Sequence, residues 1–284
     1  MHAERGLPRA AGMTEVRVGL VQMTSTDDRV ANLKVAAAFV AEAAEREAAW
    51  VALPENFAYM RREGEPIDAA QSLDGDIVQT LRELAQRHAV WLLGGTFAEK
   101  IPGDERLYNS SLLLSPDGEI AAHYRKIHLF DVDLGDAGGG AFCESRTFRA
   151  GEAPVLAETP FGPVGLSVCY DLRFPELYRR YADAGARFLC VPSAFAPATG
   201  RDHWEVLLRA RAIENQAFVL APAQSGRHSD SRESYGHAMA VDPWGGVLAT
   251  AADGPGLILV DCDLGQLERI RKAVPALGHR RLEP

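Results

Sequence analysis

One cysteine in this sequence stands where a nucleophile could work. The stretch Gly165–Cys169 is largely apolar, and it is followed by Tyr-Asp-Leu-Arg-Phe and then by Pro175. This order predicts a strand that ends at Cys169, a turn, and a helix with Pro175 in its first turn. The sulfur would then point out of the carboxyl end of the strand, near helix N-terminal amides that favour a thiolate. A free cysteine is more often buried and inert, so the nucleophile hypothesis depends on partners elsewhere in the chain.

Two charged residues are candidate partners for this cysteine. A cysteine hydrolase needs a base for the thiol proton, a cation or donor for the oxyanion of the tetrahedral intermediate, and a group that activates water. Glu55 closely follows the apolar segment Trp50–Leu53, and Lys126 closely follows the segment Ile120–Tyr124. The ends of buried strands are where α/β proteins present active groups, although each residue alone could be a solvated charge on the rim. None of the eight histidines stands in a setting that singles it out as the base.

Together these three residues carry a family resemblance. Glu55, Lys126 and Cys169, in these contexts and in this order, resemble the Glu–Lys–Cys triad of the nitrilase superfamily of carbon–nitrogen hydrolases. The similarity covers roughly residues 16 to 281, and Cys143-Glu144-Ser145 resembles the position of a second glutamate in that family. The resemblance implies that Glu55 acts as general base and that Glu144 orients Lys126 or assists proton transfer. The alternative for Glu144 is a mere charge on an irregular loop.

The residues after the cysteine indicate the branch of the family. Tyr170-Asp171 resembles the amidase branches, whereas true nitrilases carry Trp-Glu there, so a nitrile substrate is disfavoured. The motifs Ser193-Ala194-Phe195 and Thr199-Gly200 resemble both ω-amidases and deaminated glutathione amidases, and Ser225–His228 followed by Tyr235–His237 favours the latter. Ala196–Ala198 and Arg201-Asp202 depart from the pattern of both, which bears on the substrate and not on the chemistry.

The resemblance implies a cysteine-dependent amidase. Such an enzyme hydrolyses a small carboxylate-bearing amide to acid and ammonia through a thioester acyl-enzyme, and the branch favours deaminated glutathione as substrate. The alternatives are an ω-amidase acting on α-ketoglutaramate or α-ketosuccinamate, and an N-carbamoyl amino acid hydrolase. Two alternatives belong to other classes of function. The chain could be a non-catalytic ligand-binding protein with the same fold, or a redox-sensing thiol protein.

Further residues are expected to stabilise the oxyanion and bind the substrate. The resemblance implies that Lys126 and the backbone N–H of Tyr170 hold the oxyanion. Arg173 could clamp a substrate carboxylate in a bidentate manner, or it could form a structural salt bridge. We expect Thr199 to bind the same end of the substrate, and Phe195 and Phe130 to form walls of the pocket.

The elements that position these residues alternate along the chain. Short apolar runs and helical patterns together predict mixed sheets with helices outside, a layered α/β architecture. The resemblance makes this a four-layer α-β-β-α sandwich of the nitrilase type with two mixed sheets. Strands are expected at 16–23, 50–53, 90–97, 110–114, 120–124, 164–169, 188–191, 217–221, 237–241, 247–250 and 257–260, and helices at about 28–47, 77–88, 175–184, 203–216 and 264–272.

Two segments fall outside this pattern. Residues 1–14 are expected to be a flexible extension, and residues 15–284 a single carbon–nitrogen hydrolase domain. The segment Asp131–Glu152 carries five glycines and no clear periodicity. Such length without structure predicts a lid or binding loop, with a disordered insertion as the alternative.

The composition limits the partners. Of 284 residues, 47% are apolar and 24% charged, which is ordinary for a globular protein. Thirty Lys and Arg against 39 Asp and Glu give a net charge of −9, which argues against a nucleic-acid or anionic-membrane partner. No apolar run is long enough to span a bilayer, and residues 1–12 lack the apolar core of a secretory signal.

The cysteines indicate the compartment. They are far apart and form no C-x-x-C pair, which favours a cytoplasmic thiol enzyme over a disulfide scaffold. No cluster of His, Cys and Asp has metal-ligand spacing, so neither a metal nor another cofactor is expected. The expected partner is a small-molecule amide, and the resemblance implies a homodimer or a higher homo-oligomer. Cys190 is expected in the core, and Cys143 could be a second, exposed thiol.

Overall fold

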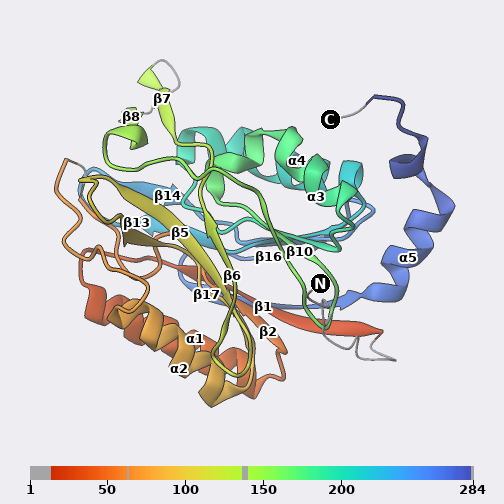
Figure 1. Ribbon diagram of the computed structural model, residues 1–284, viewed down its shortest axis with the longest axis horizontal. Coiled ribbons are helices and arrows are strands. Elements are labelled where there is room, and N and C mark those ends of the chain that lie inside the picture. The colour runs from red at the N-terminus through yellow and green to blue at the C-terminus, as the bar shows by residue number, and fades with distance from the viewer. Residues whose placement is uncertain (1–13, 63, 136–139, 283–284) are drawn as a thin grey trace, which may run out of the picture.

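Two β-sheets lie face to face in this protein, and helices cover the outer face of each (Figure 1). The computed structural model describes residues 14–62, 64–135 and 140–282. The order of the layers is α-β-β-α, which confirms the predicted α/β sandwich with two mixed sheets. The flexible extension was expected at residues 1–14. Of these, residues 1–13 lie outside the described residues.

The larger sheet has nine strands in the order β14-β13-β1-β2-β3-β5-β4, with β17 paired to β1 and β6 paired to β5. It is mixed, because the pairs β13–β1, β1–β2 and β2–β3 are parallel and the other pairs are antiparallel. Its strands are β1 (Glu15–Met23), β2 (Trp50–Ala52), β3 (Trp91–Leu93), β4 (Phe97–Lys100), β5 (Leu107–Leu114), β6 (Ile120–Arg125), β13 (Ala223–Arg227), β14 (Glu233–Tyr235) and β17 (Gly256–Asp263).

The smaller sheet has six strands in the order β16-β15-β12-β11-β10-β9. β10, β11 and β12 are parallel, and the outer pairs are antiparallel. Its strands are β9 (Val155–Ala157), β10 (Val164–Leu166), β11 (Phe188–Cys190), β12 (Phe218–Ala221), β15 (Met239–Val241) and β16 (Val247–Thr250). A turn at residues 242–246 joins β15 to β16.

Helices α1 (Arg29–Glu45) and α2 (Asp76–His88) cover the larger sheet, and α3 (Pro175–Asp183) and α4 (Pro197–Asn215) cover the smaller one (Figure 1). A fifth helix, α5 (Leu264–Ala273), follows β17. Local signals set their starts: Asp28 accepts a hydrogen bond from the Ala31 N–H at 3.0 Å, and α3 and α4 each begin with a proline. None of the helices in the described ranges is long and apolar enough to cross a membrane.

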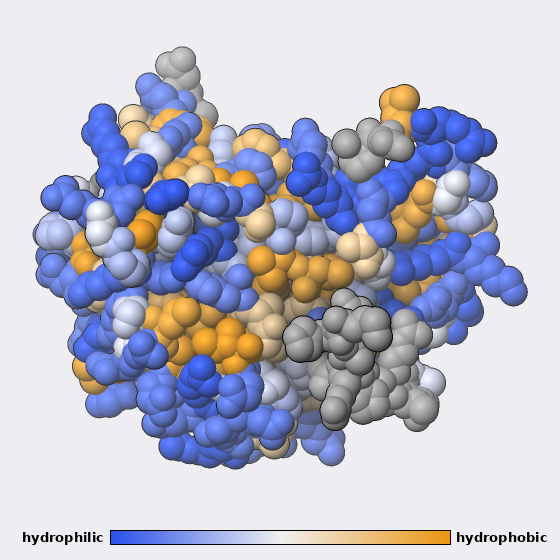
Figure 2. Space-filling view, viewed as in Figure 1, coloured by the Kyte–Doolittle hydropathy of each residue, from blue (hydrophilic) through white to orange (hydrophobic). Residues whose placement is uncertain are grey.

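The hydrophobic core has two parts. One fills the space between the sheets, where the Trp50 ring stacks on Phe161 at 6.0 Å and meets Phe188 edge-on at 5.4 Å between centroids. The other lies between the larger sheet and helices α1 and α2, with Val40 and Leu81 fully buried. On the face drawn in Figure 2, hydrophilic residues cover most of the surface and hydrophobic ones gather in smaller patches.

Several predicted elements differ from the observed ones. The strand expected at 90–97 is interrupted, because Gly94-Gly95 turn the chain between β3 and β4. Helix α4 begins at Pro197 and not at His203. Strands β13 and β14 were not predicted, since polar residues and a glycine hide their alternation.

The segment expected to be irregular contains ordered structure. It forms a two-stranded hairpin of β7 (Asp131–Asp133) and β8 (Ala141–Cys143), followed by a short 3-10 helix at Glu144–Arg146. Phe130 and Phe142 pack together at 5.2 Å between ring centroids. The described part of this segment is therefore an ordered hairpin and 3-10 helix that carry Glu144. Its role as a lid remains a prediction.

Candidate active site

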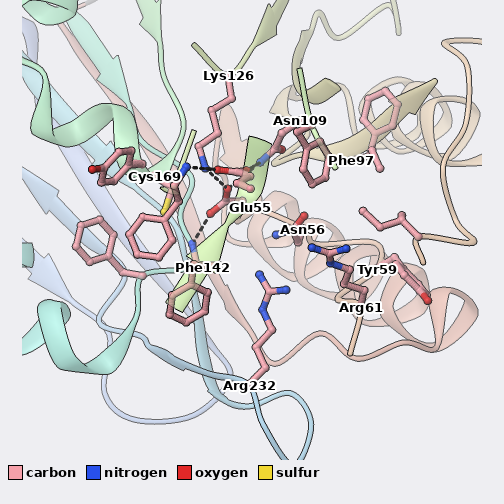
Figure 3. Close-up of a pocket in the computed structure, with 18 of the residues that line it drawn as sticks. Glu55, Asn56, Tyr59, Arg61, Phe97, Asn109, Lys126, Phe142, Cys169 and Arg232 are labelled. Atoms are coloured by element: carbon pink, nitrogen blue, oxygen red, sulfur yellow. Dashed lines mark hydrogen bonds and ion pairs between the residues drawn. The ribbon is translucent and has the colours of Figure 1, made fainter. Parts of the chain in front are cut away.

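Cys169 lies just beyond the carboxyl end of β10, with its side chain in a pocket (Figure 3). The strand ends at Leu166 and not at the cysteine, and a 3-10 helix at Cys169–Arg173 precedes α3. Cys169 has a φ of 49°, in the left-handed region, which costs a non-glycine residue of order 1–3 kcal/mol. The sharp turn directs the sulfur into the pocket. The next amide, that of Tyr170, is one of the first in the 3-10 helix and so lacks a partner within it.

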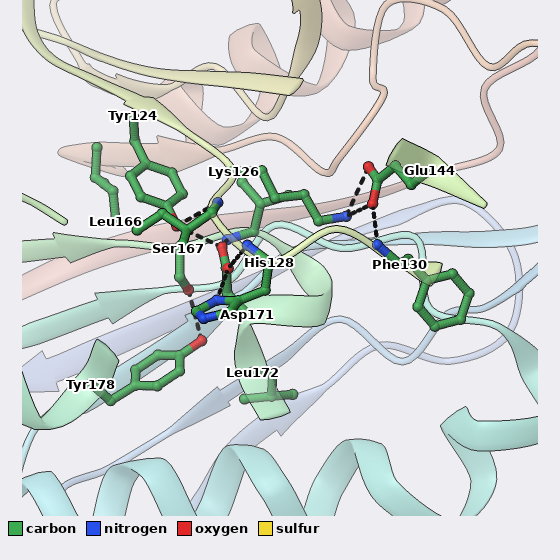
Figure 4. A network of polar contacts seen from close by, with 12 residues as sticks. Tyr124, Lys126, His128, Phe130, Glu144, Leu166, Ser167, Asp171, Leu172 and Tyr178 are labelled. Atoms are coloured by element: carbon green, nitrogen blue, oxygen red, sulfur yellow. Dashed lines mark hydrogen bonds and ion pairs between the residues drawn. The ribbon is translucent and has the colours of Figure 1, made fainter. Parts of the chain in front are cut away.

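Asp171 holds this turn in place (Figure 4). Its fully buried side chain accepts hydrogen bonds from the Val168 N–H at 2.8 Å and from the Tyr124 hydroxyl at 2.7 Å. It also accepts from the N–H of His128 at 3.0 Å and from its Nδ1–H at 2.7 Å. One donor belongs to the cysteine turn and the others to β6 and the segment after it. Asp171 therefore joins Cys169 to the part of the chain that carries the catalytic lysine candidate.

Glu55 lies in the loop after β2. Gly95 allows the segment between β3 and β4 to pass close to this loop. Gly95 has a φ of 53°, and a Cβ added there would lie 2.1 Å from the carbonyl oxygen of Pro54. This close approach lets the Thr96 hydroxyl accept a hydrogen bond from the Asn56 N–H at 2.9 Å. The backbone directly after Glu55 is thereby fixed.

The Glu55 carboxylate contacts both other members of the predicted triad. Oε1 accepts from Lys126 Nζ at 3.2 Å and from Asn109 Nδ2 at 2.9 Å, and Oε2 accepts from the Ala194 N–H at 2.8 Å. The Cys169 thiol also hydrogen-bonds to this carboxylate. With Glu55 only 3% exposed, these contacts replace the water that a carboxylate normally binds.

Glu144 holds the other side of Lys126. Nζ donates to Glu144 Oε2 at 2.8 Å and to Oε1 at 3.0 Å. The Phe130 N–H fixes the same carboxylate by a 2.6 Å hydrogen bond to Oε2. The Lys126 ammonium, 2% exposed, therefore lies between the carboxylates of Glu55 and Glu144.

The pKa values define the resting charges of the site. Burial lowers the pKa of Lys126, but the charges of Glu144 and Glu55 raise it above its usual value. Burial raises the pKa of Glu55, but the charge of Lys126 and hydrogen bonds from Cys169 and other neighbours bring it below its usual value.

The pKa of Cys169 rises well above its usual range. Burial is the largest cause, the negative charge of Glu55 adds to it, and Lys126 opposes it. The resting site therefore combines a carboxylate, an ammonium group and a neutral thiol. The expectation that nearby helix amides favour a thiolate was wrong, because five residues of 3-10 helix do not outweigh burial beside a carboxylate.

All the predicted binding residues face one pocket. It has an empty volume of about 1020 Å³, counted out to its open mouth. Besides the residues already placed, its lining includes Tyr170 and the predicted binding residues Phe130, Arg173, Phe195 and Thr199. The structure thus brings together every residue that the sequence assigned to the site.

Arg173 lies beside the cysteine at one part of this pocket. Its guanidinium carbon is 5.1 Å from the ring centroid of Phe195 and 5.8 Å from that of Tyr170, and Nη1 lies 3.1 Å from His203 Nδ1. No carboxylate in the described ranges forms an ion pair with Arg173, so the alternative of a structural salt bridge has no partner there. Burial lowers its pKa, an effect that an anionic ligand would reverse.

Several contributors were missed by the sequence analysis. Asn109 binds both carboxylates from the buried strand β5, and a polar residue in a buried strand is a signal that could have found it. The role of Asp171 was not predicted, although it belongs to the Tyr-Asp-Leu-Arg-Phe motif after Cys169. Arg61 and Arg232 line the pocket from loops, where no pattern in the sequence marked them.

Of the remaining cysteines, Cys190 and Cys143 lie where they were expected. Cys190 is buried and Cys143 exposed, Cys262 is buried, and none of the four forms a disulfide. Over the described part of the chain, no group of three or more His, Cys, Asp or Glu side chains could hold a metal ion.

Comparisons with known proteins agree with this geometry. The sequence profile of a family described as carbon-nitrogen hydrolase matches residues 17–272. The chain is 43% identical to the deaminated glutathione amidase of Synechocystis sp. (strain PCC 6803 / GT-S), covering 92% of this chain and 96% of that protein. It is 45% identical to the Homo sapiens protein of the same name, covering 93% of this chain and 82% of that one.

Solved structures share the fold. The structure of Saccharomyces cerevisiae Nit3, a member of branch 10 of the nitrilase superfamily, matches with a TM-score of 0.82 and 33% identity, over 95% of this chain and 97% of that one. The NitFhit protein of C. elegans matches with a TM-score of 0.88 and 39% identity, over 95% of this chain and 66% of that longer one.

Proposed function

The chain belongs to the carbon–nitrogen hydrolase family, and we propose that Glu55, Lys126 and Cys169 are the residues that carry out its reaction. It is a hydrolase of carbon–nitrogen bonds other than peptide bonds. The observation that carries the residue assignment is the position of the Glu55 carboxylate. It hydrogen-bonds the Cys169 thiol and the Lys126 ammonium at the same time, in a pocket lined by all three residues.

In the first half of the reaction, Cys169 forms a bond to the amide carbonyl carbon. Glu55 takes the thiol proton as the sulfur attacks, because a thiol with a raised pKa is a poor nucleophile until the proton leaves. The tetrahedral intermediate then collapses, the C–N bond breaks, and Glu55 gives the proton to the departing nitrogen. A thioester remains on Cys169.

Two donors stabilise the negative oxygen of the intermediate. Lys126 supplies a fixed charge, and the Tyr170 N–H supplies a backbone donor next to the nucleophile. Removal of one such donor typically costs about 2.7–4 kcal/mol of transition-state stabilisation. Glu144 keeps Lys126 charged and oriented by its two short contacts, so it acts through the lysine.

In the second half, water hydrolyses the thioester. Glu55, ionised again, takes a proton from the water as its oxygen bonds to the acyl carbon. The C–S bond breaks, the sulfur recovers the proton, and the acid leaves. The same carboxylate thus serves both halves, which its contacts with thiol and ammonium permit.

We propose deaminated glutathione as the substrate, with Arg173 and Thr199 binding a carboxylate of the acyl part and Phe130 and Phe195 forming walls. The name carried by the relatives supports this substrate, and the half-buried arginine beside the thiol supports the carboxylate. The leaving nitrogen is an amine for such a substituted amide and ammonia for a primary amide.

Substitutions at the triad test the mechanism. We expect Cys169→Ala and Glu55→Gln each to lower kcat/KM by at least about 10³-fold, since one removes the nucleophile and the other the base. The assay compares deaminated glutathione, α-ketoglutaramate and a carbamoyl amino acid by release of acid and of amine or ammonia. Cys262→Ala, at a buried thiol outside the pocket, is the matched control and should keep its activity.

The outcomes separate the functions. Substantial activity of Cys169→Ala would contradict the mechanism. Preference for α-ketoglutaramate would replace the substrate proposal by the ω-amidase alternative. Wild-type protein with no activity on the panel, and a Cys169 no more reactive than a model thiol towards alkylation, would favour a ligand-binding protein.

We propose in addition that residues 15–284 act as a single domain, in the cytoplasm, as a homodimer or larger homo-oligomer. Four free thiols fit a reducing compartment. Exposed apolar residues on α4 and around the β15–β16 turn, namely Val206, Ile213 and Trp244, offer a surface that a second copy could cover. Light scattering after size-exclusion chromatography tests the oligomeric state, and cell fractionation tests the location.

A further inference from the structure

Two arginines point into the pocket on the side of Glu55 away from Cys169 (Figure 3). Arg61 comes from the loop after β2, and Arg232 from the turn between β13 and β14. We propose that Arg61 and Arg232 form a second anion site, which binds a carboxylate on the leaving half of the substrate. This proposal rests on the amide hydrolysis proposed above and narrows its substrate to an amide with a carboxylate on each side of the scissile bond.

The direction of the leaving half follows from the triad. The acyl carbon must sit on the Cys169 sulfur, and the departing nitrogen must lie within reach of the Glu55 carboxylate that protonates it. A leaving group larger than ammonia therefore extends past Glu55, towards Arg61 and Arg232. Arg173 lies at the other part of the pocket, beside the rings of Phe195 and Tyr170.

Arg61 is held so that much of its guanidinium faces the pocket. Within the described residues, Arg61 Nη1 donates hydrogen bonds to the Thr147 hydroxyl at 3.2 Å and to the Glu65 carbonyl at 3.3 Å. The Met60 N–H, one residue earlier, donates to the Thr26 carbonyl at 2.9 Å and fixes the backbone. The remaining N–H groups of Arg61 have the planar arrangement that matches a carboxylate.

Arg232 is positioned by a buried histidine. The His228 N–H donates to the carbonyl oxygen of Arg232 at 2.9 Å, which closes the turn. His228 itself is buried, with Nδ1 2.8 Å from the Ser25 carbonyl and Nε2 2.9 Å from the Ser234 hydroxyl. Because a carbonyl only accepts, Nδ1 carries the proton, and burial lowers the pKa of His228 to about 4, so the ring is neutral. The turn is thus anchored in the core and does not depend on solvent.

This anchor gives a physical meaning to a motif that the catalytic site did not use. Ser225–His228 and Tyr235–His237 distinguished two branches of the family by their sequence alone. In the structure they lie on β13, on β14 and beside them, and the turn between them carries Arg232 into the pocket.

The charges of the lining favour an anion. The described residues that line the pocket include four cations and two carboxylates, and both carboxylates pair with Lys126. The other three cations are Arg61, Arg173 and Arg232. Among the described lining residues of a protein of net charge −9, cationic side chains therefore outnumber carboxylates, which is the arrangement expected for an anionic substrate.

The test compares substrates that differ only in the distal charge. Wild-type protein should hydrolyse deaminated glutathione with a kcat/KM about 10- to 100-fold above that of its C-terminal carboxamide, the usual effect of a charge-assisted hydrogen bond. Arg61→Gln and Arg232→Gln should each reduce this ratio mainly through KM, and the double variant should bring it close to one. Activity on α-ketoglutaramate, which has no leaving-group carboxylate, should change less than about two-fold and reports that the variants fold.

Matched controls and a binding measurement make the result unambiguous. Arg62→Gln and Arg227→Gln, at exposed neighbours outside the pocket lining, should keep the wild-type ratio. Calorimetric binding of both analogues to Cys169→Ala repeats the comparison without turnover. A carboxylate preference in binding that Arg61→Gln and Arg232→Gln remove supports the anion site even if hydrolysis fails. Equal binding of the two analogues by Cys169→Ala, or a preference that survives when both arginine substitutions are added to it, would overturn the anion site while leaving the amidase proposal intact.

Discussion

At the scale of single residues, the nucleophile is kept as a thiol by the same group that activates it. Burial and the Glu55 charge raise the pKa of Cys169, while Lys126 and hydrogen bonds lower that of Glu55. The two groups share one proton, and their titrations belong to the pair. Proton transfer is therefore part of the attack, in contrast to a cysteine hydrolase in which a histidine stores a preformed thiolate.

The first prediction concerns the dependence of activity on pH. The active form needs one proton on the Cys169–Glu55 pair, so kcat/KM falls only below the lowered pKa of Glu55 and above the raised pKa of Cys169. We expect a flat profile between about pH 5 and pH 8, because the ordinary values are about 4.3 for Glu and 8.5 for Cys. The profile is measured on a primary amide whose own groups do not titrate in this range.

An ascending limb centred near pH 7 would contradict this assignment, since it would indicate a base with a histidine-like pKa. The same shifts affect folding with a definite sign. The lowered pKa of Glu55 stabilises the fold above the unfolded value, and this contribution is lost as pH falls through the folded value. The raised pKa of Cys169 makes the unfolded chain lose its proton first, so stability decreases above the ordinary thiol range. Urea midpoints across pH provide the measurement.

At the scale of elements, the sequence predicts the strands better than the turns that place the functional side chains. Buried strands such as β2 and β10 are continuous apolar runs. Glu55 and Lys126 were marked as charged residues at the ends of β2 and β6. The end of β10 at Leu166, the left-handed Cys169 and the burial of Asp171 could not be predicted, because they depend on contacts with β6. Local propensity does not contain such long-range pairs.

Asp171→Asn tests the link between the cysteine turn and β6. An amide NH₂ in place of a carboxylate oxygen would face donors such as the Val168 and His128 N–H groups, and each buried donor left without an acceptor costs about 1–3 kcal/mol. We expect urea unfolding to show a loss of at least about 2 kcal/mol, together with lower kcat. The exposed Asp202→Asn should stay within about 0.5 kcal/mol of wild type. Equal stability of the two variants would show that Asp171 does not hold the turn.

The loop that presents Glu55 gives a second prediction at this scale. In Gly95→Ala the new Cβ would lie 2.1 Å from the Pro54 carbonyl at a φ of 53°. Left-handed strain and overpacking together predict a loss of about 3 kcal/mol or more, with Glu55 displaced and activity reduced. Gly103→Ala, at a φ of 79° with no atom within 4 Å of the new Cβ, carries only the strain and should cost about 1–2 kcal/mol. Similar losses in both variants would mean that the backbone moves away from Pro54 at little cost.

At the scale of the whole molecule, two sheets meet so that their parallel strands end at one pocket. Glu55 follows β2 of the larger sheet, Cys169 follows β10 of the smaller one, and the hairpin β7–β8 brings Glu144 to the same place. Sequence patterns and the family resemblance predicted the layers and these residues. They could not predict Arg61 or Arg232, since loops place a side chain through distant anchors such as Thr147 and His228.

The distribution of charge leads to a prediction about salt. The net charge of −9 repels an anionic substrate at long range, whereas the pocket arginines attract it at short range. The Debye length falls from about 30 Å at 0.01 M salt to about 8 Å at 0.15 M, so added salt removes the long-range repulsion before it weakens contacts inside the pocket. We expect kcat/KM for a dianionic amide to rise a few-fold over this range and to fall again towards 1 M. An uncharged amide should show neither change, and a kcat/KM that decreases from the lowest salt onward would mean that the pocket arginines dominate the approach of the substrate.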